Sequence, residues 1–221
     1  MKFYDCKTAP SPRRARIFIS EKGLSPDHIE IDLRNGEQLS EAFQSVNPYC
    51  TVPVLELDDG TRLTTTTGIW HYLEAAYPEP RLMGSTAQER GRVADLQWRI
   101  ESSGFTAISE YLRNSAPALK GRALTGPVGY DQIPALAERG QARLTHFLNT
   151  VDALIGDNSF VAGETFSVAD IDLLVVLDFA KWRKMTLQDN AKNAKRSYEA
   201  CLLYTSDAAD DTPCVDLGGR R

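Results

Sequence analysis

Two features of the segment 47–70 have residue types and spacing that suit a polar ligand, and the first is a proline at the start of a strand. Residues 52–57 (VPVLEL) form a β-branched and aliphatic strand pattern in which Pro53 stands near the beginning. A missing N–H is tolerated there, and a cis bond before Pro53 would turn the backbone of Val52 outward. The pattern therefore predicts a backbone edge that an extended ligand can pair with.

The second feature is the run of threonines at 64–67, which precedes the apolar spacing of a helix beginning near Thr66. The unpaired N–H groups and the dipole at such a helix start attract a carboxylate. A strand-initiating proline and a threonine cap without any ligand would give the same pattern, so these residues alone leave both interpretations open.

Residues that bind metals or exchange disulfides are scattered through the chain. No cysteine pair has the CxxC spacing of a redox dithiol, and no cysteine or histidine has the spacing of a zinc site. The residues concerned are Cys6, Cys50, Cys201, Cys214, His28, His71 and His146. We therefore expect no bound metal.

The first 77 residues predict the elements that position these groups. The strand, helix, strand, helix, hairpin and helix order is thioredoxin-like, and its crossover connection makes the first two strands parallel. The expected elements are a strand at 2–5, a helix ending at Gly23, a strand at 28–33, a helix at 37–46, a hairpin across 52–64 and a helix from Thr66.

The rest of the chain predicts helices. Two prolines in 77–83 stop the preceding helix and form a stiff connector. Amphipathic patterns at 87–112 and 131–155 predict two long helices, the first with a bend at 102–104. An S-x-x-D box at 167–170 predicts the start of another, largely buried helix. This half is expected to be an α-helical domain.

The final segment, 201–221, shows no helical periodicity and is similar to a translated sequencing adapter. We expect it to be non-native and without function. The predicted organisation is therefore a thioredoxin-like domain at 1–77, a linker at 78–86, an all-α domain at 87–200 and this tail.

Composition narrows the class of protein. The chain has 221 residues, 42% hydrophobic and 25% charged, which is typical of a globular protein with a sizeable core. Its net charge of −5 argues against nucleic acid as a partner. No apolar run reaches the length of a membrane span, and the N-terminal segment lacks a signal-peptide core. We expect a cytoplasmic protein with no membrane partner.

The order NP-x-x-x-VPVL, hairpin, hydroxyl cap and G-I-W-x-Y-L, followed by the S-x-x-D box, resembles the glutathione S-transferase family over residues 2–200. The resemblance implies that Val52 and Pro53 contact the cysteinyl part of glutathione through the backbone. It also implies that Thr65 and Thr66 hold the γ-glutamyl group. The family usually has Glu-Ser at that pair, so this chain lacks the carboxylate that would pair with the ligand's ammonium.

The resemblance also implies that a Tyr, Ser or Cys near the first helix holds the glutathione sulfur as a thiolate, which is the nucleophile. Aligning the Arg-Arg-Ala of this chain places the usual hydroxyl or thiol position on Ala9. Ser11 and Thr8 are the neighbouring hydroxyls, and Cys6 lies further back on the strand. We favour Ser11, with Thr8 as the alternative; a hydroxyl at Ser11 that merely caps the helix is equally compatible with the sequence.

The function implied is conjugation of the glutathione thiolate, as co-substrate, to a small hydrophobic electrophile that no residue identifies, in a homodimer concerned with detoxification. A glutathione-fold protein that binds or regulates without catalysis is the alternative, because Ala9 and Thr65 depart from the family pattern. A thiol transferase acting through Cys6 is the third possibility.

Overall fold

The structure is a computed structural model that describes residues 1–204, and the chain divides into two compact units. The first unit contains Met1–Pro80 together with Leu124–Gly129, and the second contains 81–123 and 130–204. The division after Pro80 falls inside the predicted connector 77–83.

A four-stranded sheet forms the centre of the first unit, and its strands have the order β2-β1-β3-β4. Its strands are β1 (Lys2–Asp5), β2 (Asp27–Glu30), β3 (Val54–Glu56) and β4 (Arg62–Leu63). As predicted, β1 and β2 are parallel, while β3 pairs antiparallel with both β1 and β4. The Asp-Gly hairpin between β3 and β4 has Gly60 at φ +86°, a conformation that glycine adopts without strain.

Helices cover both faces of this sheet. Helices α1 (Pro10–Glu21) and α3 (Thr66–Ala76) pack against each other, with the rings of Phe18 and Trp70 6.1 Å apart. On the opposite face, Phe43 of α2 (Glu41–Val46) packs edge-on against Tyr4. The single helix predicted at 37–46 is wrong, because a 3₁₀ turn (Glu37–Leu39) ends at Ser40. The Ser40 side chain then caps α2 by accepting from the Phe43 N–H.

The second unit is helical, as predicted, but its first long helix is not continuous. Helix α4 (Ala87–Ile100) passes into a π-helical turn (Glu101–Phe105), and α5 (Thr106–Ser115) follows. The turn covers residues 102–104, where the sequence predicted a bend. Glycine suits position 104 because a Cβ there would lie 3.0 Å from Phe147 and from Val176. The helical segment that begins at Ala87 ends at Ser115, whereas the sequence predicted its end at Leu112.

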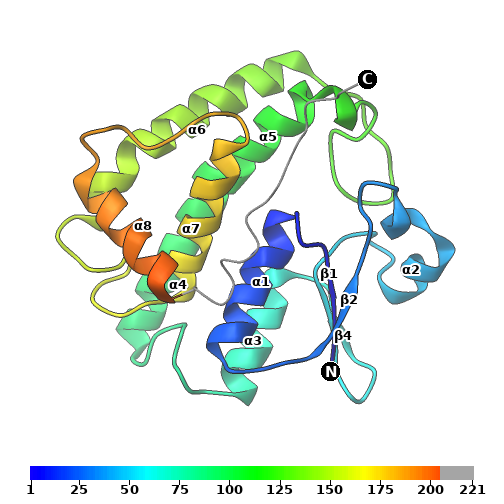
Figure 1. Cartoon of the computed structure of the whole chain (residues 1–221), viewed down its shortest axis with the longest axis horizontal. Helices are drawn as coiled ribbons and strands as arrows, with labels where there is room; N and C mark the ends of the chain where they lie inside the picture. Colours follow the sequence, from blue (N-terminus) through cyan, green and yellow to red (C-terminus); the bar gives the residue numbers. More distant parts are fainter. Residues whose placement is uncertain (205–221) are drawn as a thin grey trace. The chain divides into compact units, whose positions relative to one another are not determined.

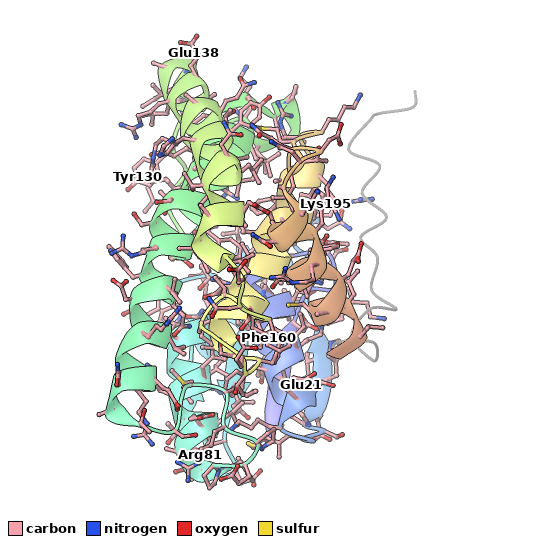
Figure 2. All side chains as sticks on the ribbon, turned by 90° about the vertical axis from the view of Figure 1, so that its left-hand side faces the viewer. Glu21, Arg81, Tyr130, Glu138, Phe160 and Lys195 are labelled. Atoms are coloured by element: carbon pink, nitrogen blue, oxygen red, sulfur yellow. The ribbon has the colours of Figure 1, made fainter. Side chains whose placement is uncertain are left out.

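Helix α6 (Pro134–Ile155) packs along α5. It begins at Pro134 rather than at 131, since proline suits the first position of a helix. Figure 2 shows Tyr130 before this helix and Glu138 near its start. A Cβ on Gly140 would lie 2.6 Å from the backbone nitrogen of Tyr111, so the two helices approach more closely than any side chain there allows.

Helix α7 (Val168–Lys181) is largely buried and begins at the predicted capping box. The Asp170 carboxylate accepts hydrogen bonds from the N–H and hydroxyl of Ser167 and from the Val161 N–H. Burial raises the pKa of Asp170 to about 6, against the opposing effect of these hydrogen bonds. The box joins the 160–163 turn to the helix start, which is a structural role.

Helix α8 (Lys192–Tyr204) corrects the sequence prediction for the start of the tail. The helix continues past position 200, and Cys201 is 3% exposed, so at least this part of the predicted tail belongs to the packed unit. The remaining predicted tail lies outside the described residues. Throughout 1–204, none of the helices is both long enough and apolar enough to cross a membrane.

Candidate functional site

The strand directions place three candidate groups at one edge of the sheet. Strand β1 ends at this edge and leads into α1. Since β3 is antiparallel to β1, with Val54 opposite Tyr4, β3 begins at the same edge. Since β4 is antiparallel to β3, it ends there and leads into α3. The start of α1, the Val52–Pro53 bond and the start of α3 therefore share one edge of the first unit. Figure 1 shows α1 and α3 beside the sheet.

The Val52–Pro53 peptide bond is cis, the form that the sequence pattern allows there. Pro53 is buried and Val52 is half-buried. Among residues 1–204, the N–H and C=O groups of Val52 make no hydrogen bond, because the ladder of β3 begins at Val54. An unpaired backbone donor and acceptor are therefore available for an extended ligand.

The loop before this bond is held by Asn47, a residue that sequence reasoning did not single out. Its side chain is fully buried and donates to the backbone and side-chain oxygens of Thr51, at 2.7 and 3.1 Å. Its Oδ1 accepts from the Tyr49 N–H at 3.0 Å. The signal was present, because asparagine before proline favours a turn in which the amide bonds to nearby backbone.

Helix α3 begins where the threonine run predicted. Thr65 is the N-cap, and its hydroxyl oxygen accepts from the Gly68 N–H at 3.0 Å. Thr66 is only 7% exposed, whereas Thr65 and Thr67 are exposed. The N–H groups of Thr66 and Thr67 have no partner within the described part of the chain. These donors at the positive end of the helix dipole suit a carboxylate.

Only one of the first three residues of α1 has a backbone N–H group. Ala9 is the N-cap and no side chain caps the helix. Pro10 and Pro12, the first and third helical residues, have no N–H, so Ser11 supplies the one backbone donor between them. The hydroxyl of Ser11 makes no hydrogen bond within residues 1–204. Capping by Ser11, the alternative that the sequence left open, is therefore not formed.

The other two candidates lie in the loop before Ala9. Thr8 is exposed, with its Oγ1 3.5 Å from the Sγ of Cys6. Cys6 is 5% exposed. A nucleophilic or exchanging thiol has to reach its partner, so this burial argues against thiol transfer through Cys6.

One group of side chains has the composition of a metal site. Ligand atoms of Asp5, His28 and Glu30 lie within 4.8 Å of one another. The Asp5 carboxylate already has a cationic partner, because the Arg16 Nη1 lies 2.6 Å from its Oδ1. That positive charge opposes a cation at the same carboxylate.

Comparisons with known proteins agree on one family. Residues 8–76 match the profile described as "Glutathione S-transferase, N-terminal domain". The chain is 32% identical over 202 residues to glutathione S-transferase 2 of Saccharomyces cerevisiae, covering 90% of this chain and 84% of that protein.

A solved structure and a second relative extend the comparison. The crystal structure of Gtt2 from Saccharomyces cerevisiae superposes with a TM-score of 0.84 at 30% identity, covering 94% of this chain and 100% of that one. A maleylacetoacetate isomerase of Pseudomonas aeruginosa is 29% identical over 184 residues, covering 79% of this chain and 78% of that protein.

Proposed function

Because the chain belongs to the glutathione S-transferase family, we propose that it conjugates the glutathione thiolate to a small hydrophobic electrophile. In this reaction the sulfur forms a bond to an electrophilic carbon. A leaving group departs with its electron pair, or an activated double bond takes up the electrons and then a proton. The observation that carries the proposal is the gathering of unpaired hydrogen-bonding groups from β3, α1 and α3 at one sheet edge.

Glutathione binds, in this proposal, along the Val52–Pro53 segment. The unpaired N–H and C=O of Val52 pair with the cysteinyl backbone, and cis Pro53 sets their direction. The γ-glutamyl carboxylate then accepts from the N–H groups of Thr66 and Thr67, with the hydroxyls of Thr65 and Thr66 beside it.

The thiol is activated at the start of α1. Ser11 donates its hydroxyl hydrogen to the glutathione sulfur, and Thr8 is the alternative donor. A donor to the charged form lowers the thiol pKa, so that more thiolate is present at neutral pH. The proton leaves to solvent.

A second candidate function is isomerisation that uses glutathione. The 29% identity to a maleylacetoacetate isomerase favours it. The same thiolate would add to an activated double bond, permit rotation, and then leave, so the binding residues would be unchanged. Assays with an unsaturated dicarbonyl substrate and with an aryl halide distinguish the two activities. Assembly as a homodimer in the cytoplasm stays a prediction from the family resemblance.

The experiment that tests the proposal is an ultraviolet titration of the thiolate of bound glutathione on the full chain between pH 5 and 9. A bound thiol pKa well below the ~8.5 of a free thiol supports activation and transferase chemistry. Binding without a pKa shift would contradict activation, and no binding at all would contradict the site.

A further inference from the structure

The last residue of β1, Asp5, has a carboxylate with no exposed surface and no part in the proposed ligand contacts. Its Oδ1 accepts from the Cys6 N–H and from Arg16, each at 2.6 Å. Its Oδ2 lies 2.6 Å from the Nε2 of His28 on β2. A buried charge is costly unless it is paired in this way, and an apolar residue would fill the space at less cost. Packing alone therefore does not explain the Asp5 carboxylate at this buried position.

Arg16 carries the contacts of Asp5 into the neighbouring loop. Its Nη1 also lies 3.4 Å from the carbonyl oxygen of Cys6, and its Nη2 lies 3.1 Å from the carbonyl oxygen of Lys7. The guanidinium of Arg16 is planar and rigid, and it contacts the Asp5 carboxylate and the carbonyl groups of Cys6 and Lys7 at the same time. Arg16, a residue of α1, therefore fixes the loop that precedes α1.

The same loop is held from its other side. The Lys7 N–H donates to the Glu30 Oε1 on β2 at 2.9 Å, and the Ala9 N–H donates to the Cys6 carbonyl oxygen at 2.9 Å. Residues 6–9 contain Thr8 and lead directly into Ser11. The backbone that presents both candidate hydroxyls is therefore tied to β1, β2 and α1.

We propose that Asp5 and Arg16 are a positioning pair, which fixes the loop at residues 6–9 so that the activating hydroxyl stays aligned with the glutathione sulfur. The inference rests on the proposed function. His28 holds the second carboxylate oxygen in place. It stands opposite Phe3, two residues before the strand end, so it lies back from the edge where the ligand binds.

The pair acts through geometry, and small displacements of reacting groups reduce rates strongly. Arg16→Lys keeps the positive charge but replaces a rigid fork by a single ammonium, which cannot hold the carboxylate and both carbonyl groups together. The exposed Arg99, whose Nε lies 2.8 Å from Asp95 on the same helix, gives the matched control variant Arg99→Lys.

The experiment measures three quantities on the full chain: kcat at saturating glutathione with a chlorodinitrobenzene, the thiol pKa of bound glutathione, and amide exchange over residues 6–9. In Arg16→Lys we expect kcat to fall about tenfold. We also expect a thiol pKa about one unit higher and faster exchange, with the Kd for glutathione changed less than about threefold. Arg99→Lys should change none of these.

Unchanged kcat and thiol pKa in a folded Arg16→Lys protein would overturn the inference, as would equal losses in the Arg99→Lys control. If Arg16→Lys does not fold, Glu30→Ala decides, because Glu30 is 45% exposed at its side chain. Its loss frees the Lys7 N–H and removes a carboxylate oxygen 3.9 Å from the His28 Nε2, while the contacts of Arg16 with the loop remain. Faster exchange with lower kcat supports positioning, and no change refutes it. A wild-type chain that fails to bind or activate glutathione contradicts the proposed function instead.

Discussion

Replacing Ser11 by alanine removes a hydroxyl that has no hydrogen-bond partner among residues 1–204. The backbone N–H of residue 11 remains, and so do the prolines on either side. Because no internal hydrogen bond is lost, the unfolding midpoint should change little. Any kinetic effect then reports on the hydroxyl's interaction with the bound thiol.

The size of that effect follows from the charge on the acceptor. A hydrogen bond to a charged group contributes about 1.5 to 3 kcal/mol, and one pKa unit corresponds to about 1.4 kcal/mol. Losing the hydroxyl should therefore raise the thiol pKa of bound glutathione by about one to two units. At a pH below the thiol pKa of glutathione bound to the wild type, kcat at saturating glutathione falls about 10- to 100-fold, while the affinity for the neutral thiol is unchanged.

The assay combines ultraviolet titration of bound glutathione with kcat measured at saturating glutathione. Thr8→Ala is the matched control, since Thr8 is the alternative hydroxyl and is exposed in the preceding loop. A shift in Thr8→Ala alone would move the role to Thr8. Unchanged thiol pKa and kcat in both variants would refute activation by either hydroxyl.

Three further changes test other parts of the structure. Thr66→Ala should weaken glutathione binding by about 1 to 2 kcal/mol, by loss of a bond to the ligand carboxylate; an unchanged Kd in calorimetry would contradict this. The raised pKa of Asp170, about 6, means that its contribution to the unfolding free energy is complete below about pH 4 and is lost as pH rises through 6. Urea unfolding should show the wild type losing on the order of 3 kcal/mol relative to Asp170→Asn between pH 4 and 7, whereas a constant difference would argue against the shift. Gly140→Ala should destabilise by about 1 to 3 kcal/mol through the clash with Tyr111, while Gly91→Ala, which meets no atom within 4 Å, should stabilise by about 0.5 to 1 kcal/mol. Equal effects of the two substitutions would show that helix propensity, not close approach, decides.

The sequence determined the features that depend on short stretches of chain. Proline at the start of a strand allowed the cis bond at Pro53, a run of hydroxyls before an apolar periodicity predicted a threonine cap near Thr66, and the S-x-x-D box predicted the start of α7. Each depends on steric or hydrogen-bond preferences that act within a few residues. The parallel pairing of β1 and β2 was also predicted, because a crossover connection joins them.

Local preferences were insufficient where packing or position in the fold decides. The break at Ser40 and the start of α6 at Pro134 show that periodicity locates a helix better than it locates its ends. The segment from 201 onward has no helical periodicity, yet Cys201 is buried within α8. The Cys201 side chain is buried against the rest of the unit. A short window of sequence does not contain those contacts, so it does not predict that the helix continues there.

For the candidate site, the sequence provided the residue types and the tertiary structure provided their partners. Nothing local distinguishes Arg16 from the arginines beside it, because the carboxylate of Asp5 reaches it only when β1 and α1 fold together. The burial of Cys6 and the unpaired hydroxyl of Ser11 likewise depend on neighbours distant in the chain. The local sequence predicted which segments bind a ligand, and long-range packing decided which of their side chains have no partner within the described residues.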